Sequence, residues 1–135
     1  ASELKDRVAL SGLSTQIEFV GTVADIVSEY QNADIFVLPS KFEGYGMVLS
    51  EAIAHGLPII STRTGAIPEV VPESAGILVK SEDHSALAAA LKKLILDGGL
   101  RNKMQLSAQK AASTLPSWRA CAELIVKGTE IIPKR

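Results

Sequence analysis

The chain has 135 residues, of which 47% are hydrophobic, and a formal net charge of −1. This length allows one sizeable core. The near-neutral charge gives no bulk electrostatic reason to expect nucleic acid or an anionic membrane surface as a partner. The N-terminal residues lack the apolar region of a signal peptide, and no apolar run approaches the roughly 20 residues of a membrane span. We therefore expect a single cytoplasmic domain over residues 1–135, in which any anion is bound by local geometry.

The first third of the chain predicts two helices and two strands. Apolar residues spaced among charges predict a short helix over 2–13, and the brief apolar run at 17–20, closed by glycine, predicts a strand. Thr22 is the expected cap of a second helix that runs to Tyr30. The segment DIFVLP at 34–39 is continuously apolar, as in a strand that is covered on both faces in a parallel sheet.

The remaining chain alternates further helices with two more strands. The strands are expected at 57–62 and 76–79, where apolar runs are bounded by turn residues. Gly56 fits the C′ position of the helix before the first of them, and Gly98 and Gly99 are expected to end a later helix. In chain order, the expected helices cover 46–55, 67–71, 81–97, 100–113 and a segment that begins after Pro116.

Strands that alternate with helices at this spacing predict right-handed crossovers and a parallel, doubly wound α/β sheet. Ligands of such sheets bind at the carboxyl ends of the strands, where the loops at 40–46 and 62–69 fall. Only four strands can be identified, and the chain begins with a helix. We therefore expect the sheet to be incomplete, with its leading strands upstream of this chain.

Two glutamates, Glu43 and Glu51, bracket the start of the helix expected at 46–55. In a continuous helix this spacing separates them by ~12 Å, whereas the carboxylate pair of a glycosidase lies ~5 to 9.5 Å apart. The spacing better suits an extended ligand with hydroxyls at both ends and an anion between them. Placement of Glu43 in a loop shortens the distance, so a hydrolytic pair stays open on geometry alone.

The turn between the two glutamates has the residues of an anion site. The backbone N–H groups of Tyr45, Gly46 and Met47 would face a pyrophosphate at the helix start. Gly44 and Gly46 would allow close backbone approach or positive φ. Neither a P-loop nor G-x-G-x-x-G is present. Glycine-rich turns with a nearby glutamate also occur for packing and capping alone, so the residues by themselves leave both interpretations open.

The segment EGYGMVLSEAIAHGLPIISTRTGAIPEVV closely resembles the donor-binding signature of retaining glycosyltransferases of family four. The resemblance rests on Glu-x7-Glu, on the following Ala-x-Gly-x-Pro and on the downstream Gly-x-x-x-Glu, and it extends over about residues 17–131. It implies a Rossmann-like domain, namely the C-terminal half of the GT-B architecture, in which two such domains face each other across a cleft. The acceptor-binding N-terminal domain is then absent from this chain.

The resemblance also implies roles for individual residues. Glu43 would be the catalytic-site glutamate that binds hydroxyls of the transferred sugar, and Glu51 would bind the ribose hydroxyls. Glu69 would either contact the ligand or support the neighbouring loop. Backbone of Gly44, Tyr45, Gly46, Met47 and Val48 would hold the diphosphate and sugar, and base contacts would come from Gly21, Thr22 and Val23.

Departures from the family pattern limit what the chain alone is expected to do. Family members supply an arginine and a lysine from the start of this domain to neutralise the departing diphosphate, and no matching segment precedes Ser2. Lys41 and Arg63 occupy other motif positions. No Asp-x-Asp or His/Cys cluster predicts a metal, so we expect no metal and no cofactor beyond a UDP-, GDP- or ADP-hexose donor.

The function implied is the donor-binding part of a retaining enzyme that transfers a hexose from a nucleotide sugar to an acceptor hydroxyl. The isolated chain is expected to be inactive, and contact with a membrane surface would come only through the absent N-terminal domain. Two alternatives remain: a noncatalytic α/β interaction module derived from such a domain, and a fragment of a nucleotide-sugar epimerase.

Overall fold

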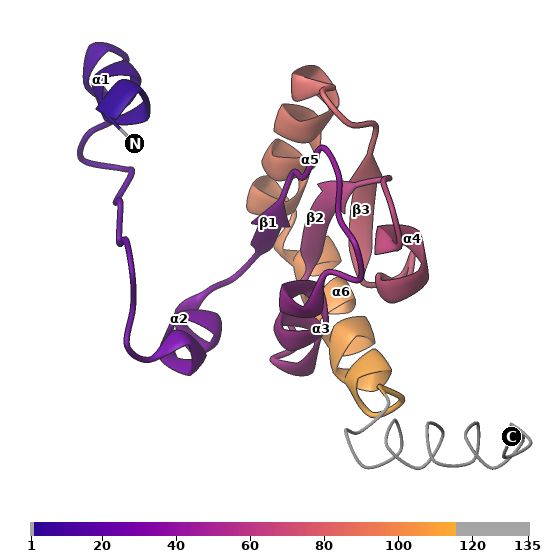
Figure 1. Ribbon diagram of the computed structural model, residues 1–135. Helices are drawn as coiled ribbons and strands as arrows, with labels where there is room; N and C mark the ends of the chain where they lie inside the picture. The colour runs from indigo at the N-terminus through magenta and orange to yellow at the C-terminus, as the bar shows by residue number, and fades with distance from the viewer. Residues whose placement is uncertain (1, 116–135) are drawn as a thin grey trace, which may run out of the picture.

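The computed structural model describes residues 2–115. Its centre is a parallel sheet of three strands, β1 (Phe36–Leu38), β2 (Ile59–Thr62) and β3 (Gly76–Val79), in the order β1-β2-β3 (Figure 1). All three strands lie within the ranges expected from the sequence. The helix expected after Pro116 lies outside the described residues.

Helices cover both faces of the sheet, which confirms the predicted parallel α/β fold (Figure 1). They are α3 (Met47–Ala54), α4 (Ile67–Val70), α5 (His84–Leu96) and α6 (Gly98–Ala112). The position of the central strand, β2, explains why its sequence is continuously apolar. Ile59 packs into one buried cluster and its neighbour Ile60 into the other, because successive side chains of a strand point to opposite faces.

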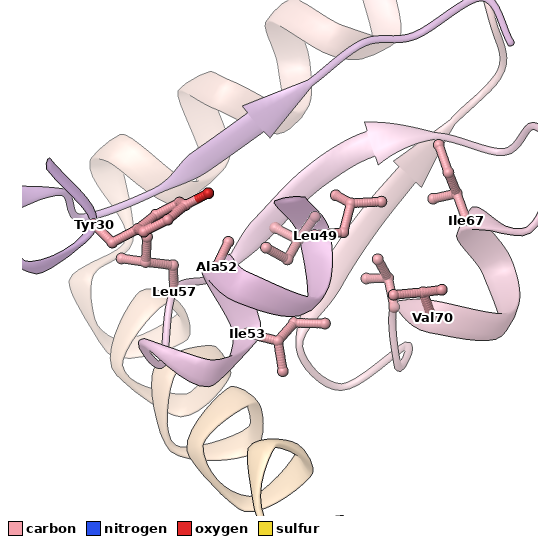
Figure 2. Close-up of a cluster of buried hydrophobic side chains, with 9 residues drawn as sticks. Tyr30, Leu49, Ala52, Ile53, Leu57, Ile67 and Val70 are labelled. Atoms are coloured by element: carbon pink, nitrogen blue, oxygen red, sulfur yellow. The ribbon is translucent and has the colours of Figure 1, made fainter. Parts of the chain in front are cut away.

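The larger of the two clusters lies on the face that α3 and α4 cover (Figure 2). Leu49 and Ile53 of α3 meet Ile67 of α4 there, and all three are fully buried. Full burial of such side chains contributes about 1.5–3 kcal/mol each. This packing fixes α3, and with it the segment that carries both glutamates, against the sheet.

The boundary between α5 and α6 differs from the prediction. Gly98 and Gly99 directly follow the end of α5, as expected, but they also form the first turn of α6, which was expected to start at residue 100. Asp97 ends α5 and also caps α6, because its carboxylate accepts a hydrogen bond from the Leu100 amide at 2.8 Å. A side-chain cap of this kind starts a helix even where glycine propensity is poor.

The segment before the sheet gives two further corrections. Helix α1 (Ser2–Leu10) is present and stands apart from the sheet (Figure 1), but the expected strand at 17–20 is not formed. Phe19 and Val20 are 43% and 51% exposed. An apolar run becomes a strand only where a neighbouring edge pairs its N–H and C=O groups, and in residues 2–115 the sheet consists of β1, β2 and β3 alone.

Helix α2 (Ile26–Asn32) begins later than predicted. Its cap is Asp25, whose carboxylate accepts hydrogen bonds from the amides of Val27 and Ser28 at 3.1 and 3.2 Å. Thr22 is therefore not the cap. Aspartate is at least as good a cap as threonine. The helix therefore begins after Asp25, three residues later than Thr22.

Candidate functional site

Two loops meet at the carboxyl edge of the sheet, one after β1 and one after β2. The Thr62 hydroxyl donates to the carbonyl of Ser40 at 2.6 Å, and the Thr64 hydroxyl donates to the carbonyl of Lys41 at 3.2 Å. The Ala66 amide donates to the carbonyl of Gly44 at 3.3 Å. The loop after β2 thus holds the loop after β1 by bonds to the main-chain carbonyls of the latter. Such contacts are expected between neighbouring loops on the binding edge of a parallel sheet.

Gly65 allows the closest approach between these loops. Its φ is +53°, and a Cβ on it would collide with the carbonyl of Glu43. Only glycine fits, because it has no Cβ and tolerates positive φ. The glycine that begins the Gly-x-x-x-Glu element is therefore explained by structure in this chain: it lets the second loop support the loop that carries Glu43.

Gly46 starts α3 in the left-handed region, with φ +70°. A Cβ there would lie 2.9 Å from Leu49 Cδ1, so glycine is required here as well. The Leu49 amide donates to the Gly46 carbonyl at 2.8 Å, while the amides before it in the first turn of the helix have no intrahelical acceptor. Met47 and Val48 are 53% and 39% exposed. The helix start therefore has backbone donors without an intrahelical acceptor and carries the positive end of the helix dipole.

The two glutamates are each hydrogen-bonded by a hydroxyl group. Half-buried Glu43 accepts from Ser40 Oγ at 3.2 Å. Glu51 lies on the exposed side of α3 and accepts from the Tyr30 hydroxyl at 2.9 Å. Glu43 thus precedes Gly46, the N-cap of α3, Glu51 lies in the middle of that helix, and each carboxylate has its own hydrogen-bonded support.

Tyr30 is a site residue that the sequence did not indicate. It comes from α2, is only 5% exposed, and packs in the cluster with Leu57 (Figure 2). Burial raises its pKa to about 12, and the hydrogen bond to Glu51 and the negative charge of that carboxylate act in the same direction. The Tyr30 ring stacks on His55 with 5.1 Å between centroids. His55 is the exposed C-cap residue of α3, and its ring packs on that of Tyr30.

The remaining predicted site residues make fewer contacts with the loop after β1 and with α3. Gly21, Thr22 and Val23 lie between α1 and α2, and no hydrogen bond within residues 2–115 connects them to the loop after β1. Glu69 lies in the first turn of α4 and is exposed. Their predicted roles stay predictions.

A small pocket of about 120 Å³ opens beside the same sheet edge. Lys41 and Glu82 line it and form a salt bridge of 2.5 Å between Nζ and Oε1. The hydrogen bond and charge of Glu82 raise the pKa of Lys41, and those of Lys41 lower the pKa of Glu82. Both side chains are largely exposed, so the pair contributes little to stability. Its relevance is that a cation already lies at the binding edge.

Metal ligation and membrane insertion find no support in the part of the chain that the structure covers. Residues 2–115 contain no group of three His, Cys, Asp or Glu side chains placed to hold a metal ion. None of their helices combines the length and the apolar character that crossing a bilayer requires.

Comparison with known proteins identifies the family. The model described as glycosyl transferases group 1 matches residues 1–111. The chain belongs to this family. The match covers the sheet, both loops and every predicted site residue.

Relatives in this family are named as glycosyltransferases. The chain is 40% identical over 92 residues to the lipopolysaccharide core biosynthesis mannosyltransferase LpsB of Rhizobium meliloti, which covers 66% of this chain and 26% of LpsB. It is 39% identical over 125 residues to the D-inositol 3-phosphate glycosyltransferase of Corynebacterium jeikeium, covering 90% of this chain and 30% of that protein. The chain thus spans less than a third of the length of these relatives.

The fold is also shared with solved glycosyltransferase structures. The crystal structure of Anabaena Alr3699/HepE in complex with UDP superimposes with a TM-score of 0.89 at 24% identity, over 97% of this chain and 36% of that one. This likeness shows the fold, which is that of GT-B C-terminal domains.

Proposed function

We propose that the chain binds the nucleotide-sugar donor of a retaining glycosyltransferase that transfers a hexose to an acceptor hydroxyl. The observation that carries the proposal is the placement of Glu43 before and Glu51 after the start of α3, with backbone N–H groups that lack an intrahelical acceptor between them. An extended donor offers the complementary groups in the same order: sugar hydroxyls, diphosphate and ribose hydroxyls. Ionised carboxylates only accept hydrogen bonds and therefore suit the hydroxyls at either end.

Each part of the donor then has a designated partner. Glu43 accepts hydrogen bonds from the transferred sugar, and Glu51 accepts them from the ribose. The backbone from Gly44 to Val48 faces the diphosphate, whose negative charge the N-terminus of α3 stabilises. Gly21 to Val23 would contact the base, and Glu69 would contact the ligand or support its loop.

In the proposed reaction the bond between the sugar C1 and the diphosphate oxygen breaks, and the acceptor oxygen bonds to C1 on the same face. The acceptor proton passes to an oxygen of the departing diphosphate, so the donor itself supplies the base. The chain's contribution is to orient the donor and to stabilise its charge. Electrostatic stabilisation of this kind commonly lowers the barrier of a transfer reaction more than any other single effect. We propose that the reaction needs no metal ion.

Calorimetry with UDP, GDP and ADP tests the assignment of Glu51. UDP is the first probe, because the HepE structure of the same fold contains it. We expect the nucleotide that binds the wild-type chain to bind Glu51→Ala at least about tenfold more weakly, as for loss of hydrogen bonds to a charged acceptor. Glu73→Ala is the matched control, since Glu73 is exposed and precedes β3 at the opposite edge of the sheet. Equal affinities of Glu51→Ala and Glu73→Ala would exclude the ribose role.

A further inference from the structure

Tyr30 connects the buried core to the exposed carboxylate of Glu51. The two residues are 21 positions apart and lie on α2 and α3. The phenol ring is buried in the core cluster (Figure 2), yet its hydroxyl reaches the surface of α3 and donates to Glu51 Oε2 at 2.9 Å. A hydroxyl on a buried ring has far fewer accessible positions than one on a surface side chain.

Aromatic contacts hold the ring on two sides. The Phe36 ring at the start of β1 lies 5.9 Å from the Tyr30 ring, centroid to centroid, at a tilt of 49°. The His55 ring at the end of α3 lies at 5.1 Å and is stacked at 16°. Tilted and offset-stacked pairs at these distances are favourable beyond their burial. The phenol is therefore anchored to the sheet and to α3 at the same time.

The hydrogen bond uses only one of the two carboxylate oxygens of Glu51. In residues 2–115 no donor to its Oε1 is found. A carboxylate has about four acceptor positions, so the second oxygen is available to a ligand. Because its pKa is raised to about 12, the phenol keeps its proton throughout the physiological range and acts as a constant donor.

We propose that Tyr30 is a positioning residue, which fixes the Glu51 carboxylate so that its free oxygen accepts a hydrogen bond from the ribose diol of the donor nucleotide. This inference rests on the proposed function. A glutamate on an exposed helix face otherwise samples several rotamers, and ordering it on binding weakens affinity. Support of a binding side chain by a rigid neighbour removes that cost before the ligand arrives.

Tyr30→Phe tests the proposal, because it keeps the ring and removes only the hydroxyl. The probes are UDP and 2′,3′-dideoxy-UDP, or the GDP or ADP pair if that base is the one bound. We expect the dissociation constant for UDP to rise about threefold to tenfold and that for the dideoxy analogue to stay unchanged. A merely structural role would weaken both nucleotides alike, and that result would overturn the proposal. Ser113→Ala, which removes a hydroxyl bonded to the Lys110 carbonyl at the end of α6, is the control and should change neither constant.

Glu51→Ala separates this inference from the proposed function. In the wild-type chain UDP should bind more tightly than its dideoxy analogue, and Glu51→Ala should abolish that difference and make Tyr30→Phe silent. If the wild-type chain binds none of the three nucleotides, or does not discriminate between the members of a pair, the ribose role of Glu51 fails and the inference fails with it. If Glu51→Ala abolishes discrimination but Tyr30→Phe discriminates like the wild type, only the inference is overturned.

A measurement on the ligand-free protein does not depend on how well Tyr30→Phe folds. In proton NMR the Tyr30 hydroxyl proton should exchange slowly with water and show an Overhauser contact to the Glu51 side chain, since it is hydrogen-bonded and carried by a buried ring. Both signals should disappear in Glu51→Ala. Their absence from the wild-type spectrum would contradict a fixed carboxylate.

Discussion

Glu43 and Glu51 differ in how firmly their carboxylates are held. Ser40, which bonds Glu43, is itself part of the loop after β1, and its hydrogen bond is 3.2 Å long. Tyr30 bonds Glu51 at 2.9 Å from a buried ring. In the proposed donor complex the firmly held Glu51 binds the ribose, which is the same in every donor. The more loosely held Glu43 binds the sugar, and its side chain can shift slightly to reach the sugar hydroxyls.

The raised pKa of Tyr30 predicts a loss of stability at alkaline pH. A tyrosine in the unfolded chain titrates near pH 10, whereas Tyr30 in the folded chain has a pKa of about 12 because of burial first and of Glu51 second. Its contribution to stability is therefore fully present below about pH 10 and is lost as the pH rises through about 12.

Urea unfolding at pH 9 and pH 11.5 measures this effect. We expect the free energy of unfolding to fall more steeply with pH in the wild type than in Tyr30→Phe, because lysines and other groups titrate in both proteins. Parallel pH profiles for the two proteins would show that the phenol is not protected by the folded state.

Among the elements, the contact between the two loops has the most specific sequence requirement. Gly65→Ala forces a Cβ against the carbonyl of Glu43 and an L residue into φ +53°. We expect a loss of about 2 kcal/mol or more in the free energy of unfolding. Gly44→Ala is the control in the facing loop, since its Cβ would meet no atom within 4 Å.

Denaturant midpoints of the two alanine variants provide the test. A Gly65→Ala midpoint as close to the wild type as that of Gly44→Ala would mean that the loops separate at little cost, and the support of the Glu43 loop by the second loop would then be unimportant.

The sequence predicted well those elements whose signals are local or periodic. Runs of apolar residues indicated all three strands of the sheet, and Gly46 and Gly56 bounded α3 to within one residue at each end, because both adopt positive φ. The run at 17–20 had the same local signal, but strand formation also needs a neighbouring edge, which no local pattern reports. The motif residues of the candidate site could be named from the sequence, and their binding roles stay predictions. Tyr30 could not be named, because its contact with Glu51 joins positions 21 residues apart.

On the scale of the whole molecule, the chain spans only 26–30% of the length of the two relatives described above. Lys41, one of the cations at this edge of the sheet, is already paired with Glu82. Loss of one preorganised donor to a developing negative charge costs about 3–4 kcal/mol, or roughly two to three orders of magnitude in rate. Donor binding and sugar transfer are therefore expected to be separable in this chain.

We predict that the 135-residue chain binds a nucleoside diphosphate but forms no glycoside by itself. Incubation with UDP-, GDP- and ADP-hexoses and a panel of sugar and lipid acceptors, followed by mass spectrometry, measures this. Calorimetry on the same sample confirms that the site is intact. Glycoside formation above the protein-free control would disprove the predicted dependence on further segments.

The way in which the loop after β1 is held has a consequence for which of its residues can change. Thr62 and Thr64 bond main-chain carbonyls, which every residue type possesses. The side chains of Phe42 and Tyr45 take no part in these two bonds and are 82% and 55% exposed. Mutation at these positions can alter which ligand is preferred while the backbone stays in place. Specificity can therefore drift in this loop without the intermediate sequences losing their fold.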